Sequence, residues 1–462
     1  MHHRTTGDSR LISFFAWVTL LPACGSQNAG VADGAMNRDA GADTSTKDPE
    51  FSISVALASD ILADAPGTVG IVKWSLQEVA PDSAEIRFGL DEGYGMVAPV
   101  DLSEPDYRTL LLGMKPNRTY HFQVIATKGT KRFQSPDHTL KTGPVTNLVN
   151  VTASVRDAAL HVPGFIVTTA GPPGRVGSME ELLVTGTMII ILDGDGDVVW
   201  WYQSKVGLTP RARLSYDGKA MWLIPERTDF DGAEIELVSM DTLKSTIFGN
   251  LKASHDATVV DNGDVLAFID YGSEEDCPSV YELHMDGTKV EIFESSDYLP
   301  DMVLPDCHLN TIRYNSAKKL YTVSDRLTDI FAIDRKGKLE WRLSDIVPTQ
   351  SYGGQQHGHH LLSNSLLLFA NVGGDGGNSA ALEFSLSDGT ELFRYDPGFF
   401  SVWYGDVQRL PRGNTLVTFS FAGRIHEVDS NGNLAMEVEG PIFAYAEWRS
   451  TLYGPPSDIE MQ

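Results

Sequence analysis

Hydrophobic and polar residues alternate along much of the chain, in short runs separated by turns rich in Gly, Asp, Asn and Pro. Alternation with a period of two predicts β-strands that bury one face. Within residues 51–145 such runs fall at 68–76, 83–90, 108–114 and 120–127. Strands of this length and spacing predict a small β-sandwich.

One run in this region, LLGMKPNRTYHFQVIA, resembles the end of a fibronectin type III domain. In that family a Leu, a Pro turn and then a Tyr followed by alternating apolar residues mark a late strand. The matching positions are Leu112, Pro116, Tyr120, Phe122 and Val124, and Trp74 is the expected core aromatic. Another kind of sandwich of similar size is the alternative, because the fold class depends on alternation more than on any one residue.

From about residue 160, a unit made of a strand, a turn with Asp or Gly and a second strand repeats. Six segments share this form, and their starts are 47, 45, 50, 51 and 44 residues apart: 188–202, 235–248, 280–293, 330–343, 381–395 and 425–438. A second type of hairpin falls between them, as in VVDNGDVLAF (259–268), HLLSNSLLLFA (360–370) and RLPRGNTLVTF (409–419).

Two hairpins per period give four strands per unit, which is typical of a β-propeller blade. The chain is therefore predicted to be all-β, with a six-bladed β-propeller over residues 155–462 behind the fibronectin type III-like β-sandwich of residues 51–145. A β-helix is the alternative, but its repeats are shorter and lack paired turns.

The amino-terminal region has a different pattern. Arg4 and Arg10 precede a short apolar run that ends in Leu-Pro-Ala-Cys24, which resembles a bacterial lipobox. We predict that residues 1–23 are a lipoprotein signal peptide, that Cys24 is lipidated and that residues 24–50 are a flexible acidic linker. The protein is then exported and lipid-anchored to the bacterial membrane, facing the periplasm or the cell surface. Ordinary secretion is the alternative, because Pro22 is not the usual small residue.

Charge and cysteine content narrow the partners and the compartment. The 36 Lys+Arg against 62 Asp+Glu give a formal charge of −26, which disfavours nucleic acid as a partner. No apolar run reaches the ~18–20 residues of a membrane span, so contact with the membrane is predicted through the lipid anchor only. In an oxidising compartment Cys277 and Cys307, 30 residues apart, are predicted to form a disulfide, with free buried thiols as the alternative.

Histidines recur at one place in the second type of hairpin. Eight residues before the turn positions stand Pro210, His255, His308, His357 and Gly405. Equivalent positions in neighbouring blades converge on the channel of a propeller, so the three histidines predict a site there. The alternative is a structural histidine bonded within each blade to an Asp, as His255 with Asp256. A structural His–Asp pair of that kind would recur in every blade, whereas these histidines are absent from some blades.

The segments HDATVVDNGDVLAF, HLNTIRYN, SDRLTDIFAID and QHGHHLLSNSLLLFAN resemble the bacterial arylsulfate sulfotransferases, the nucleotide-independent arylsulfotransferases. The resemblance covers roughly residues 155–460, including the opening PGFIVTTA and the closing AEWRSTLYG. Members of that family are exported six-bladed propellers with a small β-domain in front. They move a sulfuryl group from one phenol to another through a sulfohistidine. The resemblance therefore implies an enzyme with an aryl sulfate donor and a phenolic acceptor as small-molecule partners, and with no cofactor or metal.

The resemblance assigns roles residue by residue: His357 after Gln356 is the nucleophile, His308 and Asn310 form the His-x-Asn motif, His255 is the first channel histidine, and Arg326 belongs to the Ser-x-Arg motif. During transfer, a sulfuryl group carries negative charge on three oxygens. The guanidinium group of an Arg and a side-chain amide are suited to bind these oxygens. His255 or His308 would exchange protons with the two phenols.

Two positions depart from the family pattern. His359 shares a strand face with His357 by alternation and is a candidate second channel residue, used to bind substrate. In the sixth blade Gly405 stands where a hydroxyl would be expected to help hold the sulfuryl group.

Two other functions compete with this assignment. One is a non-catalytic propeller lipoprotein that binds glycans or another ligand. The other is a metal enzyme, in which the three histidines and Asp256 or Asp306 form an open site. The metal site is disfavoured because Arg326 would lie beside the cation, and because no His-x-His or His-x-x-x-His pair lies on a suitable helix.

Overall fold

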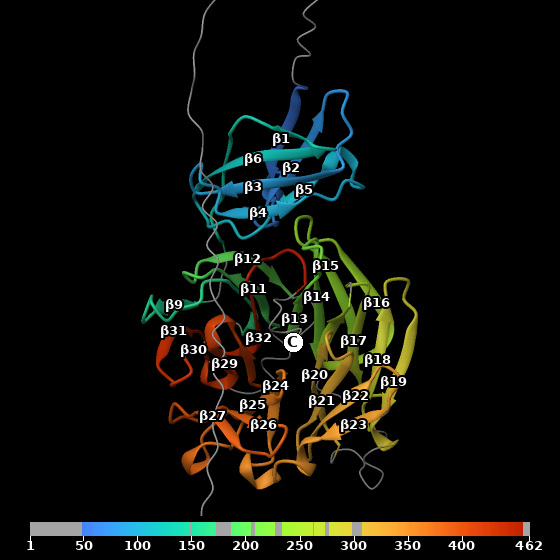
Figure 1. The fold of residues 1–462 in the computed structure, drawn as a ribbon, viewed down its shortest axis with the longest axis vertical. Coiled ribbons are helices and arrows are strands. Elements are labelled where there is room, and N and C mark those ends of the chain that lie inside the picture. The colour runs from blue at the N-terminus through green and yellow to red at the C-terminus, as the bar shows by residue number, and fades with distance from the viewer. Residues whose placement is uncertain are drawn as a thin grey trace, which may run out of the picture. The chain divides into compact units, whose positions relative to one another are not determined.

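The computed structural model describes residues 49–146, 150–171, 186–204, 208–226, 233–261, 263–272, 277–297 and 307–455. The predicted signal peptide, Cys24 and most of the predicted linker lie outside the described residues. Strands dominate the described part, so the protein is all-β as the alternation predicts (Figure 1). Its described helices are short: α1 (Ala58–Ile61) and the 3-10 turns η1 (Pro105–Tyr107), η2 (Ser295–Asp297), η3 (Leu343–Asp345), η4 (Thr349–Ser351), η5 (Asp375–Gly377), η6 (Pro411–Gly413) and η7 (Ser420–Ala422).

The amino-terminal domain is a sandwich of two sheets. One sheet has the order β1-β2-β5, with β1 (Phe51–Leu57), β2 (Gly70–Leu76) and β5 (Thr109–Leu111). The other has the order β4-β3-β6-β7, with β8 paired to β6: β3 (Ser83–Gly89), β4 (Met96–Pro99), β6 (Thr119–Lys128), β7 (Lys131–Gln134) and β8 (His138–Lys141). Trp74, Phe88 and Phe122 belong to one buried cluster that both sheets share. Trp74 is therefore a core aromatic, as predicted.

The other described strands form five antiparallel sheets. The first has the order β12-β11-β10-β32, with β10 (Phe165–Ala170), β11 (Met188–Leu192), β12 (Val198–Gln203) and β32 (Phe443–Arg449). The second runs from β13 to β19: β13 (Leu208–Leu214), β14 (Ala220–Glu226), β15 (Ala233–Ser239), β16 (Ser245–Val260), β17 (Val265–Asp270), β18 (Ser279–His284) and β19 (Lys289–Glu294).

Three further sheets follow in chain order. They consist of β20 (Leu309–Asn315), β21 (Leu320–Asp325), β22 (Ile330–Asp334) and β23 (Leu339–Arg342); of β24 (Gln356–Leu361), β25 (Ser365–Ala370), β26 (Ala380–Ser385) and β27 (Glu391–Tyr395); and of β28 (Asp406–Arg409), β29 (Thr415–Phe419), β30 (Arg424–Val428), β31 (Leu434–Glu439) and β9 (Thr152–Val155). Because β9 pairs with β31, this domain begins before the predicted residue 155.

One strand of each repeat lies at the centre of the domain. β13, β16, β20, β24, β28 and β32 contact one another in this order, and β32 contacts β13 again, so the strands form a closed ring (Figure 1). The carboxyl-terminal β32 pairs with β10, and the amino-terminal β9 pairs with β31. A ring of radial sheets closed in this way is the architecture of a β-propeller.

Burial explains why inner and outer strands differ in sequence. β25 (SLLLFA) is buried at every position, whereas in the outer strand β27 (ELFRY) only the central Phe393 is buried. A strand with both faces covered requires a continuous apolar run, and a strand at the edge requires only one apolar face. The six segments of the first predicted type are the outer strand pairs, and the second type forms the inner pairs.

Candidate active site

Three of the predicted histidines come from the beginnings of neighbouring inner strands or from the residues just before them. His308 directly precedes β20, and His357 is the second residue of β24. His255 lies within the long β16, where the strand leaves its pairing with β15 and begins to pair with β17. The ring of Tyr404 lies between two of them, with centroid distances of 6.3 Å to His255 and 6.2 Å to His357. The repeat register therefore brings the three histidines to one end of the ring.

His255 and His308 form a direct pair. Their Nε2 atoms are 3.1 Å apart, so one must carry a hydrogen and the other must accept it. Burial lowers the pKa of His255 to about 4 and that of His308 well below its usual value, because a buried imidazole resists charging. His255 also has a left-handed backbone with φ of +63°, a strained conformation that often marks functional sites.

His357 is held in one tautomer by Asn371. Its Nδ1 lies 2.6 Å from Asn371 Oδ1, while Asn371 Nδ2 donates to the backbone oxygens of Ser401 and Tyr404 at 2.8 and 3.0 Å. Because the amide nitrogen faces two acceptors, Asn371 Oδ1 must accept and His357 Nδ1 must donate. Burial lowers the pKa of His357 to about 3, so the ring is neutral near pH 7 and Nε2 keeps its lone pair.

Arg326 lies beside the three histidines. Its backbone N–H donates to the His308 carbonyl at 2.9 Å, and its positive charge lowers the pKa of His255, His308 and His357 further. The backbone bond links the Ser-x-Arg and His-x-Asn motifs. The Nε of Arg326 is buried and has no hydrogen-bond partner within the described ranges. A buried guanidinium N–H without an acceptor is a ready site for an anionic oxygen.

Asn310 contacts the strand of the predicted nucleophile. Its Nδ2 donates to the backbone oxygen of Gln356 at 2.7 Å, directly before His357. One of its amide hydrogens is therefore used to hold β24, and Asn310 Oδ1 is buried without a partner among the described residues. Asn310 therefore holds β24 in position through this hydrogen bond, in addition to its predicted role of binding the sulfuryl group.

His359 has a different environment from the one alternation predicts. Its Nε2 lies 2.9 Å from Thr322 Oγ1, and Arg313 and Asp406 are the charged groups that influence its pKa. The pairing of β24 with β25 shifts register between Gln356 and His359, and this irregularity breaks simple alternation along the strand. His359 therefore lines a cavity farther along the inner strands, together with His360.

The sequence did not point to Glu226, the last residue of β14. Its Oε2 accepts a 2.6 Å hydrogen bond from the Tyr404 hydroxyl, and its Oε1 lies 3.8 Å from His255 Nε2. Burial raises the pKa of Glu226 to about 7, so this carboxyl group can hold or release a proton near neutral pH. Neither Glu226 nor Asn371 belongs to a local motif, so only their positions in space identify them.

Gly405 is required by backbone geometry. Its φ is +119°, and a Cβ at this position would lie 2.1 Å from a ring carbon of Phe369. Its carbonyl accepts the N–H of Gly358 at 2.9 Å, next to His357. A hydroxyl-bearing residue therefore cannot replace Gly405, and the hydroxyl of the preceding residue, Tyr404, donates to Glu226.

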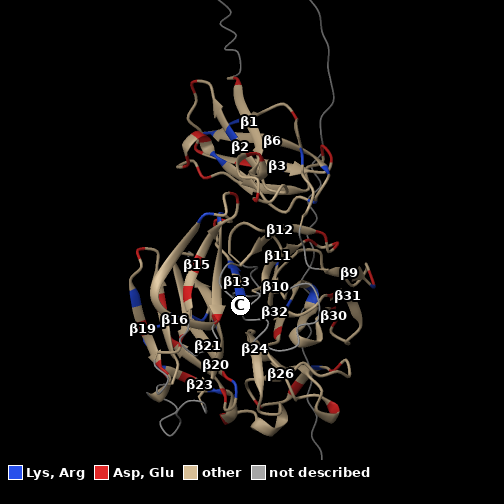
Figure 2. Cartoon of the chain, turned by 180° about the vertical axis from the view of Figure 1, so that it is seen from behind, with Lys and Arg blue, Asp and Glu red and all other residues tan. Residues whose placement is uncertain are grey.

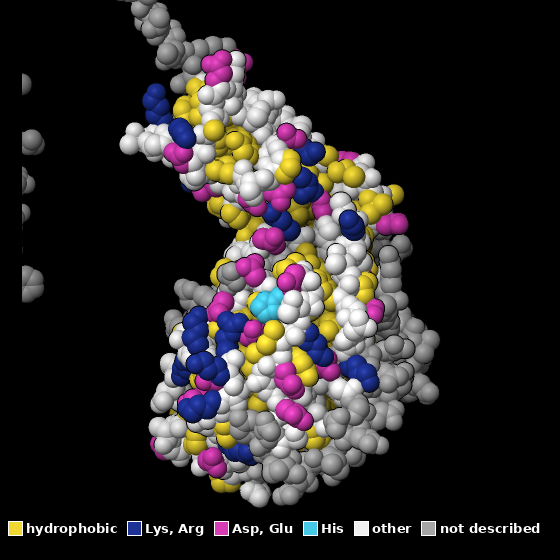
Figure 3. Space-filling view, turned by 90° about the vertical axis from the view of Figure 1, so that its right-hand side faces the viewer, with side chains coloured by type: hydrophobic (Ala, Val, Ile, Leu, Met, Phe, Trp, Pro, Cys, Tyr) yellow, Lys and Arg dark blue, Asp and Glu magenta, His cyan; other side chains and the backbone are white. Residues whose placement is uncertain are grey.

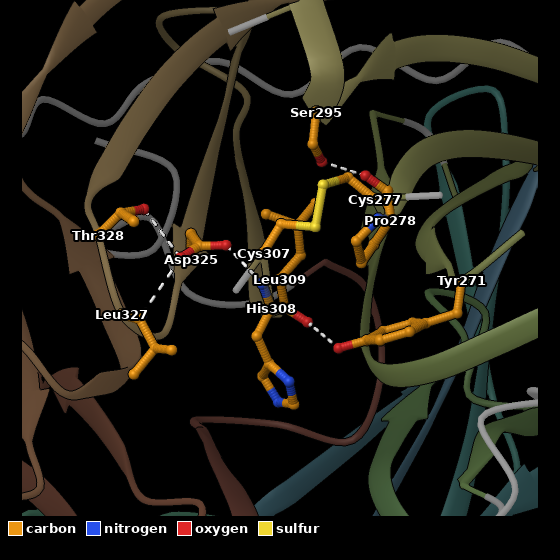
Figure 4. Close-up of a disulfide and its surroundings, with 10 residues drawn as sticks. All are labelled: Tyr271, Cys277, Pro278, Ser295, Cys307, His308, Leu309, Asp325, Leu327 and Thr328. Carbon is orange, nitrogen blue, oxygen red and sulfur yellow. Dashed lines mark hydrogen bonds between the residues drawn. A yellow bond between two sulfur atoms is a disulfide. The ribbon is translucent and has the colours of Figure 1, made fainter. Parts of the chain in front are cut away.

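Cys277 and Cys307 form a disulfide directly before His308 (Figure 4). The backbone N–H of His308 donates to Asp325 Oδ2 at 2.6 Å, and the Thr328 hydroxyl donates to Asp325 Oδ1 at 2.8 Å. On the other side Tyr271 donates to the backbone oxygen of Leu309 at 2.9 Å. The disulfide and these bonds hold the segment that carries His308 from several directions.

The described histidines and carboxylates form one group with the spacing of metal ligands. Glu92, His121 and Asp137 have ligand atoms within 4.8 Å of one another, and they lie in the sandwich domain. His121 Nδ1 already lies 2.8 Å from Asp137 Oδ2, which is the geometry of a simple ion pair. Asp306, one of the metal ligands considered from the sequence, lies outside the described residues.

Comparison with known proteins leaves the family open. No family model matches the chain. A curated relative, the large ribosomal subunit protein uL10 of Oryza sativa subsp. japonica, is 32% identical over 130 residues, which are 26% of this chain and 39% of that protein. The chain thus spans well under half of that relative.

Solved structures with similar folds include TolB from Acinetobacter baumannii, with a TM-score of 0.40 and 13% identity over 73% of this chain and 80% of that one. A streptogramin B lyase has a TM-score of 0.38 and 15% identity over 62% and 87% of the two chains. The β-propeller domain of Cps50 (Swd1) from Myceliophteria thermophila has a TM-score of 0.37 and 12% identity over 56% and 82%.

No helix in the described part of the chain is long and apolar enough to cross a membrane.

Proposed function

We propose that the ring of sheets is a six-bladed propeller and that the domain before it is of the fibronectin type III kind. The long β16 supports the first point, because its two halves pair with β15 and β17 and so divide the seven-stranded sheet into two four-stranded blades. Tyr120 supports the second. Its hydroxyl accepts the backbone N–H of Lys115 at 2.8 Å, which resembles the tyrosine corner of immunoglobulin-like sandwiches.

We propose that the protein is an aryl sulfate sulfotransferase, which moves a sulfuryl group from a phenolic sulfate ester to a phenol through a sulfohistidine. One observation carries this proposal: His357 is held by Asn371 as a neutral imidazole with its Nε2 lone pair available, beside the unpaired Nε of Arg326. Transfer of an anionic group requires an unprotonated nucleophile and a nearby cation, and His357 Nε2 and Arg326 provide these two groups.

In the first half-reaction, His357 Nε2 attacks the sulfur of the donor ester. The N–S bond forms, and the bond from sulfur to the aryl oxygen breaks. The departing phenolate takes a proton that the carboxyl group of Glu226 supplies through the neutral pair of His255 and His308. Arg326 stabilises the negative charge on the sulfuryl oxygens during the transfer. In the second half-reaction the acceptor phenol gives its proton back to the pair, its oxygen bonds to sulfur, and His357 is released.

Glu226 fits this cycle as a neighbour of the proton-exchanging pair. Its carboxyl group, 3.8 Å from His255 Nε2, has a pKa near the pH at which the protein would act. It can therefore take up a proton from His255 when the acceptor phenol is deprotonated, and return it in the next turnover.

We also propose that the protein is exported and anchored by lipid at Cys24, with no nucleic acid partner. The disulfide of Cys277 and Cys307 supports an oxidising compartment. Metabolic labelling with a tagged fatty acid should mark the natural chain and not Cys24→Ser, and equal labelling of both would contradict the anchor.

The enzymatic proposal is tested by incubating the full chain with 4-nitrophenyl sulfate and phenol and following the release of nitrophenolate. Varying both substrates should give the parallel lines of ping-pong kinetics. With donor alone, mass spectrometry should find one added sulfuryl group, stable in base and labile in acid, on the peptide that contains His357.

His357→Ala should remove almost all turnover, whereas the matched variant His138→Ala in the sandwich domain should retain it. A label on His255 or His308 would contradict the assigned nucleophile. Absence of both turnover and label in the folded protein would favour the ligand-binding alternative instead.

A further inference from the structure

The inner strands carry a second polar site beyond the histidines. Along β24, His357 is followed by His359 and His360, and along β16, His255 is followed by Thr258. A strand rises about 3.3 Å per residue, so three residues correspond to roughly 10 Å. The later residues of these strands line a cavity that is separate from the histidine pair.

A layer of buried ion pairs lies between the two regions. Arg211 donates from Nε to Asp256 Oδ1 at 2.6 Å and from Nη1 to Asp406 Oδ2 at 2.9 Å. Arg313 donates to the other oxygen of Asp406 at 2.5 Å. These residues lie on β13, β16, β28 and β20, so the layer connects strands around the ring. Figure 2 marks basic positions on β13 at the centre of the ring.

The cavity itself has a volume of about 50 Å³, and all of the ring strands contribute to its lining. Its polar lining consists mainly of Arg213, Arg313, Arg449, Glu447, His359 and His360. A volume of this size holds a few water molecules, or one small tetrahedral ion in their place.

Four guanidinium groups lie in or beside the cavity, those of Arg211, Arg213, Arg313 and Arg449. Among the described residues, they form ion pairs with Asp256, Asp406 and Glu447. All seven are buried or nearly so, apart from the half-buried Arg313. A buried guanidinium N–H without an acceptor is costly, and an oxyanion that accepts from it removes that cost.

The whole chain carries a net charge of −26, so a cluster of four guanidinium groups is unusual for it. Basic side chains also gather on one face of the surface, on both sides of a visible histidine (Figure 3). The negative net charge is therefore not spread evenly, and it does not exclude an anion from a cationic cavity.

Two lining residues also have unused hydrogen-bonding atoms. Arg213 Nη2 is buried without a hydrogen bond inside the described ranges, and its nearest carboxylate oxygen, Asp256 Oδ1, is 3.7 Å away. Its other nitrogens donate to the Ala257 backbone oxygen and to Glu447 at 3.0 Å. Likewise His359 Nδ1 is buried without a partner in the described part of the chain, while its Nε2 contacts Thr322.

We propose that this cavity binds one small tetrahedral oxyanion of the sulfate or phosphate class. The anion would accept hydrogen bonds from Arg213 Nη2 and from the Nδ1–H of a neutral His359, within the cluster of guanidinium groups. The Arg211 layer separates this site from His357, so the anion is a bound ligand and not the reacting group. The proposal does not depend on the sulfotransferase activity.

Calorimetric titration of the full chain tests the proposal. Arg326→Ala is used as the background, so that sulfate bound beside His357 is not counted. Sodium sulfate and sodium phosphate are titrated separately at constant ionic strength, with sodium chloride as the balancing salt. We expect one site per chain, and the tighter of the two ions identifies the ligand. Equal heats for chloride, or no saturable binding of either oxyanion, would overturn the proposal.

Variants connect the binding to the cavity. Arg213→Gln should weaken the affinity by about tenfold or more, because one charge-assisted bond and one positive charge are lost. The matched control Arg424→Gln, on the outer strand β30, should bind as the background does. If Arg213→Gln does not fold, Thr258→Met fills the cavity without removing charge and should also abolish binding. Unchanged affinity in the folded variant would refute the site.

Crystals soaked in selenate test independently where the anion binds. An anomalous selenium peak among Arg213, His359 and Arg449 would support the proposal. A peak only at other positions would overturn it.

Discussion

The tautomer of His357 depends on one amide. Asn371 donates its two amide hydrogens to backbone oxygens and so presents only its oxygen to His357 Nδ1. The same side chain therefore fixes both which nitrogen can attack and where it points. In the arrangement proposed here Asn371 is a positioning residue, because it reaches the reacting sulfur only through His357.

Asn371→Ala is therefore expected to lower kcat by about 10²- to 10⁴-fold, the range seen when an oriented catalytic hydrogen bond or a tautomer-fixing partner is removed. KM should change little. Nitrogen NMR of the His357 ring should show the Nδ1–H tautomer in the natural chain and a mixture in the variant. Asn371→Asp, which can still accept from Nδ1, should restore most of the single tautomer. A variant with unchanged tautomer and unchanged rate would contradict the role.

The buried histidines also make stability depend on pH. The pKa of His255 is lowered to about 4, and the pKa values of His357 and His359 are lowered to about 3, all by burial first. Between the ordinary pKa of about 6.5 and these values, the unfolded chain binds more protons than the folded one, so acid favours unfolding. Glu226, with its pKa raised to about 7, acts in the opposite sense, whereas the lowered pKa values of His308 and His426 add to the effect of acid.

We therefore expect the free energy of unfolding in urea to fall steadily as the pH drops from about 6.5 to 4. The fall should be shallower in His357→Gln, because the substituted side chain no longer titrates while its amide can still donate to Asn371. His138→Gln in the sandwich domain serves as the control and should keep the full slope. An equal slope in all three proteins would show that the buried histidines are not responsible.

At the scale of elements, the segment before β20 is held covalently. The disulfide joins Cys277, just before β18, to Cys307, just before His308 and β20. It therefore connects an outer strand pair of one sheet to the inner strand of the next. The inner strand carries Asn310 and follows His308, so the crosslink reaches two of the predicted site residues within three positions.

Replacing both cysteines by serine is expected to lower the free energy of unfolding by about 3 kcal/mol, since the crosslink restricts the unfolded chain. Turnover of 4-nitrophenyl sulfate should fall as well, because His308 loses one of its supports. Denaturant unfolding and initial rates measure the two effects. Full stability in the double variant under oxidising conditions would show that the crosslink contributes nothing.

At the scale of the whole molecule, the sandwich domain and the ring share polar contacts and a core. The Nζ of Lys115 in the sandwich domain contacts Asp193, Asp195 and Asp197 of the ring at 2.7, 2.9 and 2.6 Å. Thr68 Oγ1 also donates to the Val199 backbone oxygen at 2.6 Å, and a buried apolar cluster includes residues of both domains. Burial alone would lower the pKa of Lys115, but the three carboxylates raise it above its usual value.

Lys115→Met should therefore destabilise the protein by about 1 kcal/mol or more, because the three carboxylates lose their shared cation and repel one another. Thermal unfolding should show the lower Tm, and addition of salt should reduce the difference. Lys128→Met is the matched control, since Lys128 pairs with Asp82 inside the sandwich domain and both side chains are half exposed. A loss as large in the control would contradict a special role for Lys115.

The sequence by itself determined the strands, the hairpins and the convergence of three histidines. These features follow from local rules: alternation sets the faces of a strand, turn residues end it, and a constant spacing in a repeat places equivalent residues at equivalent points. The pairing of Cys277 with Cys307 followed from cysteine number and compartment. His308, Asn310 and His357 lie at or beside the starts of inner strands. His255 lies where β16 begins to pair with β17, and Arg326 directly follows β21.

Only the tertiary structure decided what surrounds these histidines. Glu226 and Asn371 lie at or after the ends of second strands, and they contact the site because separate sheets meet there, which no local pattern records. The register shift in β24 moved His359 out of the group that alternation assigned to it, and the close approach of Phe369 made Gly405 necessary. Such contacts depend on how the sheets pack around the ring, whereas the sequence pattern describes each strand by itself.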